Sequence, residues 1–143
     1  MLVTGATGMV GAWLTRWLVD AGAHTVAFVS DTDPQSELIR SGYIDRVAVM
    51  NGRLENYEDV ERAINNQEVD SIIHLGAQPI VGAADRSPRH TFESNIQGTW
   101  NVLDAARVLG GLVQRVVVAS SDKAYGTQPV LPYTEDMSMN GDH

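Results

Sequence analysis

Residues 3–11 read Val-Thr-Gly-Ala-Thr-Gly-Met-Val-Gly, and this stretch decides the fold. Leu2 and Val3 form the end of a buried strand, and an apolar face with helical spacing follows the glycines. A glycine turn between a strand and a helix is typical of a site for dinucleotide phosphates, because the free N–H groups of the helix face the negative charge. Gly5 would permit the turn, Gly8 the approach to the phosphates, and Gly11 the packing of helix on strand. The predicted buried face of the helix consists of Val10, Trp13, Leu14, Trp17, Leu18 and Ala21.

A second buried strand, predicted over 25–29, is followed by two acidic residues. Asp31 lies about 20 residues beyond the last glycine, where an acidic side chain can bind both hydroxyls of an adenosine ribose. Asp33 is a near-equal candidate, and for either residue the alternative is a turn or a helix cap ahead of Pro34. Positions 30–38 contain no Lys or Arg that could bind a 2′-phosphate, so the sequence favours NAD over NADP.

The composition is that of one globular domain. The chain has 143 residues, of which 43% are hydrophobic and 20% charged, and no run is apolar enough to cross a membrane. A net charge of −8 with scattered cations argues against a nucleic-acid partner. The absence of cysteine excludes disulfides and thiolate metal sites, and the four histidines lack ligand spacing, so we expect no metal. A cytoplasmic location is expected.

Strand and helix patterns alternate along the whole chain, which favours a parallel sheet covered on both faces. Further strands are predicted over 46–50, 71–75 and 115–119, and helices over 35–41, after Asn56, and over 88–109. The alternation predicts a three-layer, doubly wound Rossmann-type α/β domain with strand order 3-2-1-4-5. Residues 1–143 are expected to be an incomplete NAD-binding domain, truncated before the later strands and the substrate domain. The predicted stripe of the last helix is Phe92, Ile96, Thr99, Leu103 and Ala106.

Two further segments follow the fourth and fifth strands. They read His74-Leu75-Gly76-Ala77-Gln78-Pro79 and Ser120-Ser121-Asp122-Lys123-Ala124-Tyr125-Gly126. Together with the glycine loop and with Asn95-Ile96-Gln97-Gly98-Thr99 and Asn101, they resemble the NAD-dependent epimerase/dehydratase family of extended short-chain dehydrogenases. The resemblance covers nearly the whole chain and implies an NAD cofactor and a nucleotide-sugar substrate.

The loop motifs and the resemblance together give a set of expected cofactor contacts. Gln78 is the candidate for a substrate contact, with a hydrogen bond inside its own loop as the equal alternative. Arg53 occupies a position where relatives usually have an aspartate that contacts the adenine amino group, and an arginine cannot accept that hydrogen bond. The expected cofactor contacts are Gly5, Thr7, Gly8, Met9, Val10, Gly11, Asp31, Arg53, Leu54, Leu75, Gly76, Ala77, Asn95 and Ser120.

Within the family, Ser121-Asp122-Lys123 resembles the corresponding segment of CDP-glucose 4,6-dehydratases. The resemblance implies a lyase reaction in which NAD oxidises C4, water is eliminated across C5–C6, and the hydride returns to C6. Ser121 would bind the C4 oxygen of the substrate, Asp122 would be the acid at C6, and Lys123 would assist removal of the C5 proton. From the residues alone, a surface pair of Asp122 and Lys123, the only lysine, is an equal alternative.

The family's Tyr-x-x-x-Lys motif does not occur in the chain, so we expect residues 1–143 to be inactive alone. A nucleotide-sugar 4-epimerase or reductase fragment remains an alternative, and so does a non-catalytic NAD-binding module. Apolar surface on the helix predicted over 88–109, which resembles the family's dimer helix, favours a homodimer or other self-association.

Overall fold

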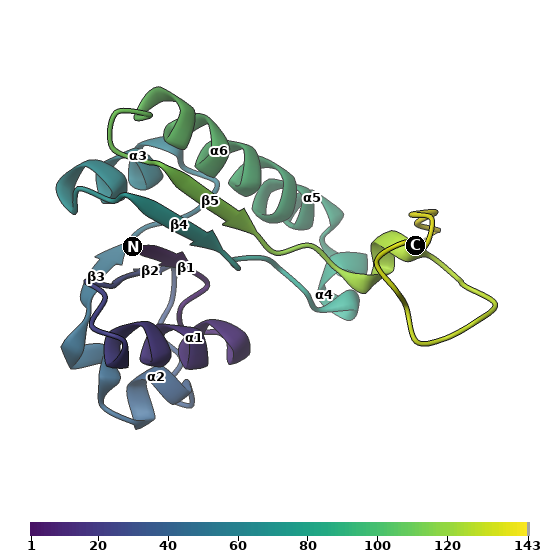
Figure 1. The fold of residues 1–143 in the computed structure, drawn as a ribbon, viewed down its shortest axis with the longest axis horizontal. Helices are drawn as coiled ribbons and strands as arrows, with labels where there is room; N and C mark the ends of the chain where they lie inside the picture. The colour runs from purple at the N-terminus through teal and green to yellow at the C-terminus, as the bar shows by residue number, and fades with distance from the viewer. Residues whose placement is uncertain (143) are drawn as a thin grey trace.

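The sheet is built from five short strands, all parallel, in a computed structural model that describes residues 1–142 (Figure 1). Their order is β3-β2-β1-β4-β5, which confirms the predicted doubly wound topology. Parallel strands with helices on both faces are mostly apolar, and β1 and β2 are buried at every position. The strands are β1 (Leu2–Thr4), β2 (Val26–Val29), β3 (Ala48–Asn51), β4 (Ser71–His74) and β5 (Arg115–Val118).

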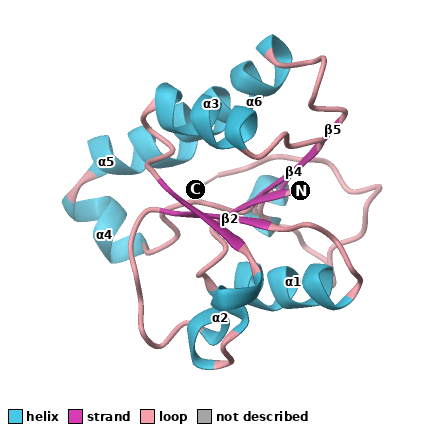
Figure 2. Ribbon diagram, turned by 90° about the vertical axis from the view of Figure 1, so that its left-hand side faces the viewer, coloured by secondary structure: helices cyan, strands magenta, loops and turns pink. Residues whose placement is uncertain are grey.

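Helices cover both faces of this sheet and divide the core into two parts. Figure 2 shows α1 (Met9–Asp20) and α2 (Glu37–Arg40) on one face, with α3 (Tyr57–Asn66) and α6 (Gly98–Val108) on the other. Alternate residues of β1 enter different cores: Leu2 packs with α3 and α6, and Val3 packs with α1 and α2. The shorter elements are η1 (Tyr43–Arg46), α4 (Val81–Arg86), α5 (Pro88–Phe92), the π-helical turn η2 (Glu93–Gln97) and η3 (Asp122–Tyr125).

Two glycines allow α1 to lie close to the sheet. Gly5 has a φ of +67°, and a Cβ there would lie 2.9 Å from the Gly76 nitrogen. A Cβ on Gly11 would lie 2.0 Å from the Gly5 carbonyl oxygen, a distance that no side chain can occupy. The predicted roles of Gly5 in the turn and of Gly11 in helix packing are therefore confirmed.

The predicted buried face of α1 is right only in part, because Leu14 and Leu18 pack half-buried against the core whereas Val10, Trp13, Trp17 and Ala21 are exposed. Val10, Trp13 and Trp17 are 62%, 46% and 66% exposed, whereas Ala12 and Thr15 are fully buried. Gly11 holds the start of the helix against the glycine loop, the fully buried residues of the helix are small, and the tryptophans lie on the outer surface. Helical spacing identified one apolar stripe, and only part of that stripe faces the core.

The helix predicted over 88–109 is divided into α5, the π turn η2 and α6. Its predicted stripe is largely on the outside, because Phe92, Ile96 and Leu103 are exposed. The buried positions of α6 are instead Gly98, Asn101, Val102, Ala105 and Ala106. Here too a helix approaches its neighbours closely through small or amide side chains. None of the helices in residues 1–142 is long and apolar enough to cross a membrane.

Candidate functional site

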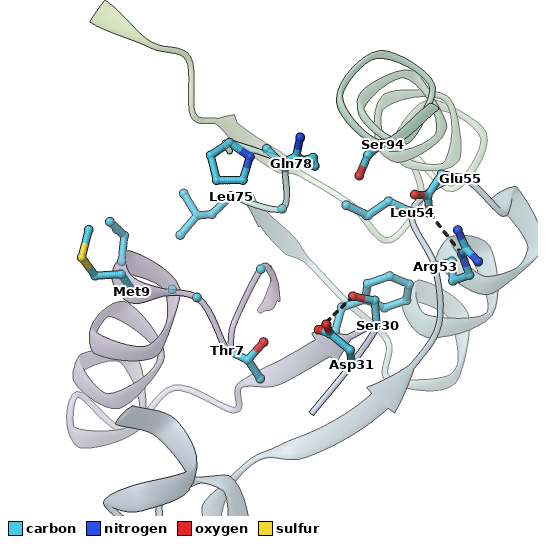
Figure 3. Close-up of a pocket in the computed structure, with 18 of the residues that line it drawn as sticks. Thr7, Met9, Ser30, Asp31, Arg53, Leu54, Glu55, Leu75, Gln78 and Ser94 are labelled. Carbon is cyan, nitrogen blue, oxygen red and sulfur yellow. Dashed lines mark hydrogen bonds and ion pairs between the residues drawn. The ribbon is translucent and has the colours of Figure 1, made fainter. Parts of the chain in front are cut away.

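A pocket of about 730 Å³ opens at the carboxyl ends of β1, β2 and β4 (Figure 3). It is formed by the glycine loop, the end of β2, the β3–α3 loop and the β4–α4 loop, as expected for a ligand site in an open parallel sheet. Its lining residues are Gly5, Thr7, Gly8, Met9, Val10, Gly11, Phe28, Ser30, Asp31, Arg53, Leu54, Glu55, Leu75, Gly76, Ala77, Gln78, Pro79, His90 and Ser94.

The glycine loop and the start of α1 form the floor of the pocket. Gly8 donates its N–H to the Gly5 carbonyl at 3.0 Å, which closes the turn, and α1 begins at Met9. No side chain of the described residues caps this helix, and its first turn has no acidic residue. The N–H groups of the first turn and the positive end of the helix dipole can therefore receive a diphosphate.

Of the two candidate aspartates, Asp31 lines the pocket and Asp33 does not. The Ser30 hydroxyl donates to the Asp31 carboxylate at 3.4 Å at the mouth of the pocket. Asp33 accepts a hydrogen bond from the Gln35 N–H at 2.8 Å, which closes a turn ahead of α2, one of the two alternatives that the sequence offered.

The β3–α3 loop lies opposite Asp31 and carries the departure from the family pattern at Arg53. The Arg53 N–H donates to Asp59 at 3.0 Å, and the exposed guanidinium lies 3.6 Å from the Glu55 carboxylate. Glu55 lines the pocket and is only 18% exposed. Sequence reasoning missed this residue, although an acid two positions after Arg53 is a signal that could have found it. It also missed Phe28, Ser30, Pro79, His90 and Ser94.

Amide side chains of η2 and α6 hold two of the pocket loops in place. Gln97 donates to the Glu55 carbonyl at 3.0 Å, and Asn101 donates to the Leu54 carbonyl at 2.8 Å. Asn95 forms a reciprocal pair with the main chain of Gln78, with distances of 2.6 and 3.0 Å.

The structure does not place Asn95 at the pocket, where sequence reasoning expected it. Its amide is used to hold the wall segment, so its cofactor contact stays a prediction without support from this geometry. The Gln78 amide likewise bonds to its own loop, accepting from the Ile80 N–H at 2.6 Å and donating to the Ile80 carbonyl at 3.1 Å.

His74 is the only buried titratable side chain near the pocket among the described residues. Its Nδ1 lies 2.7 Å from the Thr4 hydroxyl and its Nε2 lies 3.0 Å from the Thr99 hydroxyl. Burial lowers the pKa of His74 below its ordinary value of 6.5, so the ring is neutral at physiological pH. The sequence placed His74 in the segment that resembles the family, but its hydrogen bonds to Thr4 and Thr99 were not predicted. Residues 1–142 contain no group of three or more side chains placed to hold a metal ion.

The segment predicted to be catalytic is not brought to the pocket. Among the described residues, none of Ser120, Ser121, Asp122 and Lys123 lines it, and all four are exposed. After β5 the chain enters η3 and a tail that packs on itself, with the Tyr125 and Tyr133 rings stacked 5.3 Å apart. Figure 1 shows this tail extending beyond α4, away from the rest of the molecule.

Asp122 and Lys123 form an exposed pair, with 3.2 Å between the Lys123 Nζ and the Asp122 carboxylate. The hydrogen bond from Lys123 lowers the pKa of Asp122, which keeps the carboxyl ionised. A general acid needs the opposite shift. The sequence led us to expect this segment beside the pocket. In this conformation it lies away from the pocket, and the described residues leave both side chains of the pair exposed.

Stability should depend on pH through His74. Between its lowered folded pKa and the unfolded value of 6.5, the unfolded chain binds a proton that the folded chain does not, so stability falls as pH falls through this window and is unaffected above it. The slope is at most about 1.4 kcal/mol per pH unit. In urea unfolding from pH 5 to 8, His74→Asn should remove this slope, and exposed His24→Asn should keep it. An unchanged slope in His74→Asn would contradict the assignment.

Comparisons with known proteins agree with this architecture. A sequence model of the family described as GDP-mannose 4,6 dehydratase matches residues 2–142. The chain is 28% identical to the CDP-glucose 4,6-dehydratase of Salmonella typhimurium over 143 residues, which covers 99% of this chain and 40% of that protein. The chain thus spans about two fifths of the length of this relative.

Solved structures are also similar to this chain over nearly its whole length. One is a UDP-glucose-4-epimerase from Stenotrophomonas maltophila with bound NAD and formylated UDP-arabinopyranose, with a TM-score of 0.82 and 28% identity over 97% of this chain and 42% of the other. Another is a short-chain dehydrogenase/reductase superfamily protein from Agrobacterium tumefaciens with bound NAD, with a TM-score of 0.76 and 32% identity over 99% and 39%. The family match confirms the resemblance to nucleotide-sugar epimerases and dehydratases, and the chain belongs to the GDP-mannose 4,6 dehydratase family.

Proposed function

We propose that the pocket binds NAD and that the chain is the NAD-binding part of a nucleotide-sugar 4,6-dehydratase. The observation that carries the first half is the position of Asp31 at one end of a pocket whose floor is the uncapped start of α1. A diphosphate at the helix and a ribose at Asp31 match the two most strongly recognised parts of a dinucleotide. Relatives of the same fold contain bound NAD.

The direction of the cofactor follows from these two contacts. The adenosine half would lie between Asp31 and the β3–α3 loop, and the nicotinamide half would lie against Leu75–Gln78. Arg53 has no acceptor for the adenine amino group, but the Glu55 carboxylate beside it has one and faces the same pocket. We therefore assign adenine recognition to Glu55 in place of the usual aspartate.

NAD should bind more tightly than NADP, because the Asp31 carboxylate repels a 2′-phosphate. Asp31→Ala should weaken NAD binding and reduce the ratio of affinities for NAD and NADP by about tenfold, equivalent to ~1.4 kcal/mol. Asp33→Ala is the matched control and should leave the preference unchanged. Calorimetric titration of all three proteins with both cofactors measures this. A wild-type preference for NADP, or an equal loss in Asp33→Ala, would count against the assignment.

The dehydratase half of the proposal is supported by the Ser121-Asp122-Lys123 segment and by the similarity to a CDP-glucose 4,6-dehydratase. In the proposed reaction Ser121 holds the C4 oxygen, Asp122 protonates the leaving C6 hydroxyl, and Lys123 assists removal of the C5 proton. Because the pair is exposed and Asp122 is ionised here, a substrate and further protein must desolvate it before it can act.

A nucleotide-sugar 4-epimerase is the second candidate, favoured by the solved epimerase of similar structure. An epimerase or a 4-reductase needs no acid–base pair after the serine, so the role of Asp122 and Lys123 discriminates the two. A non-catalytic NAD-binding module is the third, and it fits the chain taken alone because residues 1–143 contain no Tyr-x-x-x-Lys.

The 143-residue chain should not turn over CDP-glucose or another nucleotide sugar, because loss of one member of a cooperating catalytic set removes most of the rate. A chimera that joins it to the remaining segments of a dehydratase relative should form a 4-keto-6-deoxy product. In that chimera, Asp122→Asn should stop after oxidation at C4 and leave bound NADH, visible by absorbance. Full elimination activity in both Asp122→Asn and Lys123→Ala would favour the epimerase or reductase.

We also propose that a second copy of this chain covers the outer face of α5, η2 and α6. A groove there is lined by Pro88, Phe92, Ile96 and Trp100, with the ion pair of Arg89 and Glu93 beside it. The three large apolar side chains are exposed and contiguous along the groove, a pattern that favours association.

Light scattering should therefore detect a dimer whose fraction rises with protein concentration. Ile96→Lys places a charge in the centre of the groove and should shift the protein to monomer at the same concentration. Val130→Lys changes an equally exposed apolar residue of the tail and should leave the dimer intact. A wild-type protein that stays monomeric at high concentration would rule the dimer out.

A further inference from the structure

We propose that His74 is a positioning residue, whose neutral ring completes a chain of hydrogen bonds that fixes both ends of the pocket wall Leu75–Gln78. This inference rests on the proposed NAD site, because the wall is the side of the pocket assigned to the nicotinamide half. The histidine itself does not line the pocket.

One end of the wall is held through Thr4, a residue of β1 that is 1% exposed. Its hydroxyl oxygen accepts the Gly76 N–H at 3.0 Å and the Leu75 N–H at 3.1 Å. The Leu75 N–H also reaches the Thr4 carbonyl, at 3.3 Å. Gly76 is therefore the wall residue whose amide depends most on the threonine hydroxyl.

The other end of the wall is held through Thr99 and Asn95. The Thr99 hydroxyl donates to the Asn95 carbonyl at 2.7 Å, inside the π turn. The side chain of Asn95 then binds the main chain of Gln78 through its donor and its acceptor together. Both ends of the wall thus lead back to the two ring nitrogens of one histidine.

The hydrogen-bond partners of the His74 ring determine which of its nitrogens carries the proton. Since Thr99 gives its hydrogen to Asn95, its oxygen accepts from His74 Nε2–H. In the neutral ring Nδ1 is then an acceptor, and the Thr4 hydroxyl donates to it. Thr4 thereby uses its one hydrogen and both lone pairs, with none to spare.

Protonation of His74 would put a third donor on the Thr4 oxygen, which has room for two. The Thr4 hydroxyl hydrogen would lose its acceptor, and the Leu75 and Gly76 N–H groups would compete with the ring for the threonine oxygen, so protonation weakens the hold on this end of the wall. The groups that face the ring from β1 and α6 are the hydroxyls of Thr4 and Thr99, and burial is the sole cause of the lowered pKa. The neutral ring is therefore part of the built site.

Hydrogen exchange without ligand and calorimetric titration with NAD test this together. Thr4→Val should lower the protection factor of the Gly76 amide by about tenfold and weaken NAD binding by a similar factor. Thr4→Ser restores the hydroxyl and should keep both within about twofold of wild type. The matched control is Thr15→Val, since the Thr15 hydroxyl is buried without a partner in the described chain and should leave both quantities unchanged.

Thr99→Val tests the other branch if Thr4→Val fails to fold, and it should lower the protection of the Gln78 amide while Thr99→Ser retains it. Unchanged protection of Gly76 in Thr4→Val and of Gln78 in Thr99→Val would overturn the proposal. So would equal losses in Thr15→Val. The pH dependence tests the histidine itself: corrected for the intrinsic rate, protection of the Gly76 amide should fall in the wild type as His74 is protonated, and His74→Asn should lack this dependence. A wild type without this dependence would overturn the proposal. If the wild type binds no NAD, the proposed function fails, and the exchange data still decide the role of His74.

Discussion

The close approach of α1 to β1 is the constraint on which the rest of the structure depends. The Gly5 carbonyl lies so close to Gly11 that no side chain fits between them at this point. This contact holds the open end of α1 at the pocket, and Gly5 lies against the start of the β4–α4 loop. The fully buried residues of α1 are small, and Val10, Trp13 and Trp17 lie outside, so one helix contributes both to the binding site and to an apolar exterior.

The walls of the pocket are held by polar groups in addition to Leu54 and Leu75, which pack against the two apolar cores. The loops after β3 and β4 have few apolar side chains of their own, and loops of this kind are mobile unless their backbone groups are bonded. The amides of Asn95, Gln97 and Asn101 supply those bonds from η2 and α6. Each buried bond of this type contributes about 1 kcal/mol, and leaving one partner unpaired costs more than the bond provides.

Much of the fold could be predicted from local patterns, because β-branched runs and glycine turns report directly on strands and connections. The strand order, the glycine loop and the place of Asp31 are of this kind. The orientation of α1 was not, since a face of Val10, Trp13 and Trp17 looks buried until the distance from helix to sheet is known.

The candidate site likewise depends on contacts between residues far apart in the sequence, which local sequence patterns do not reveal. The amide hydrogen bonds that hold the pocket loops join residues far apart in the chain, such as Asn101 and Leu54, and no spacing rule connects them. The π turn that places Asn95 beside Gln78 depends on that packing and has no signal of its own in the sequence. The position of Ser121 and its neighbours depends on tertiary contacts at the end of β5, and the sequence of the segment itself does not specify those contacts.

The outward-facing side of α1 also determines how this protein can be observed. All three tryptophans, Trp13, Trp17 and Trp100, are about half exposed or more, and none of them lines the pocket. Their fluorescence in the folded monomer therefore resembles that of the unfolded chain, which makes emission a poor signal for unfolding. Loss of helical circular dichroism follows the fold instead, and the indoles are left as reporters of what docks on the outer surfaces of α1 and α6.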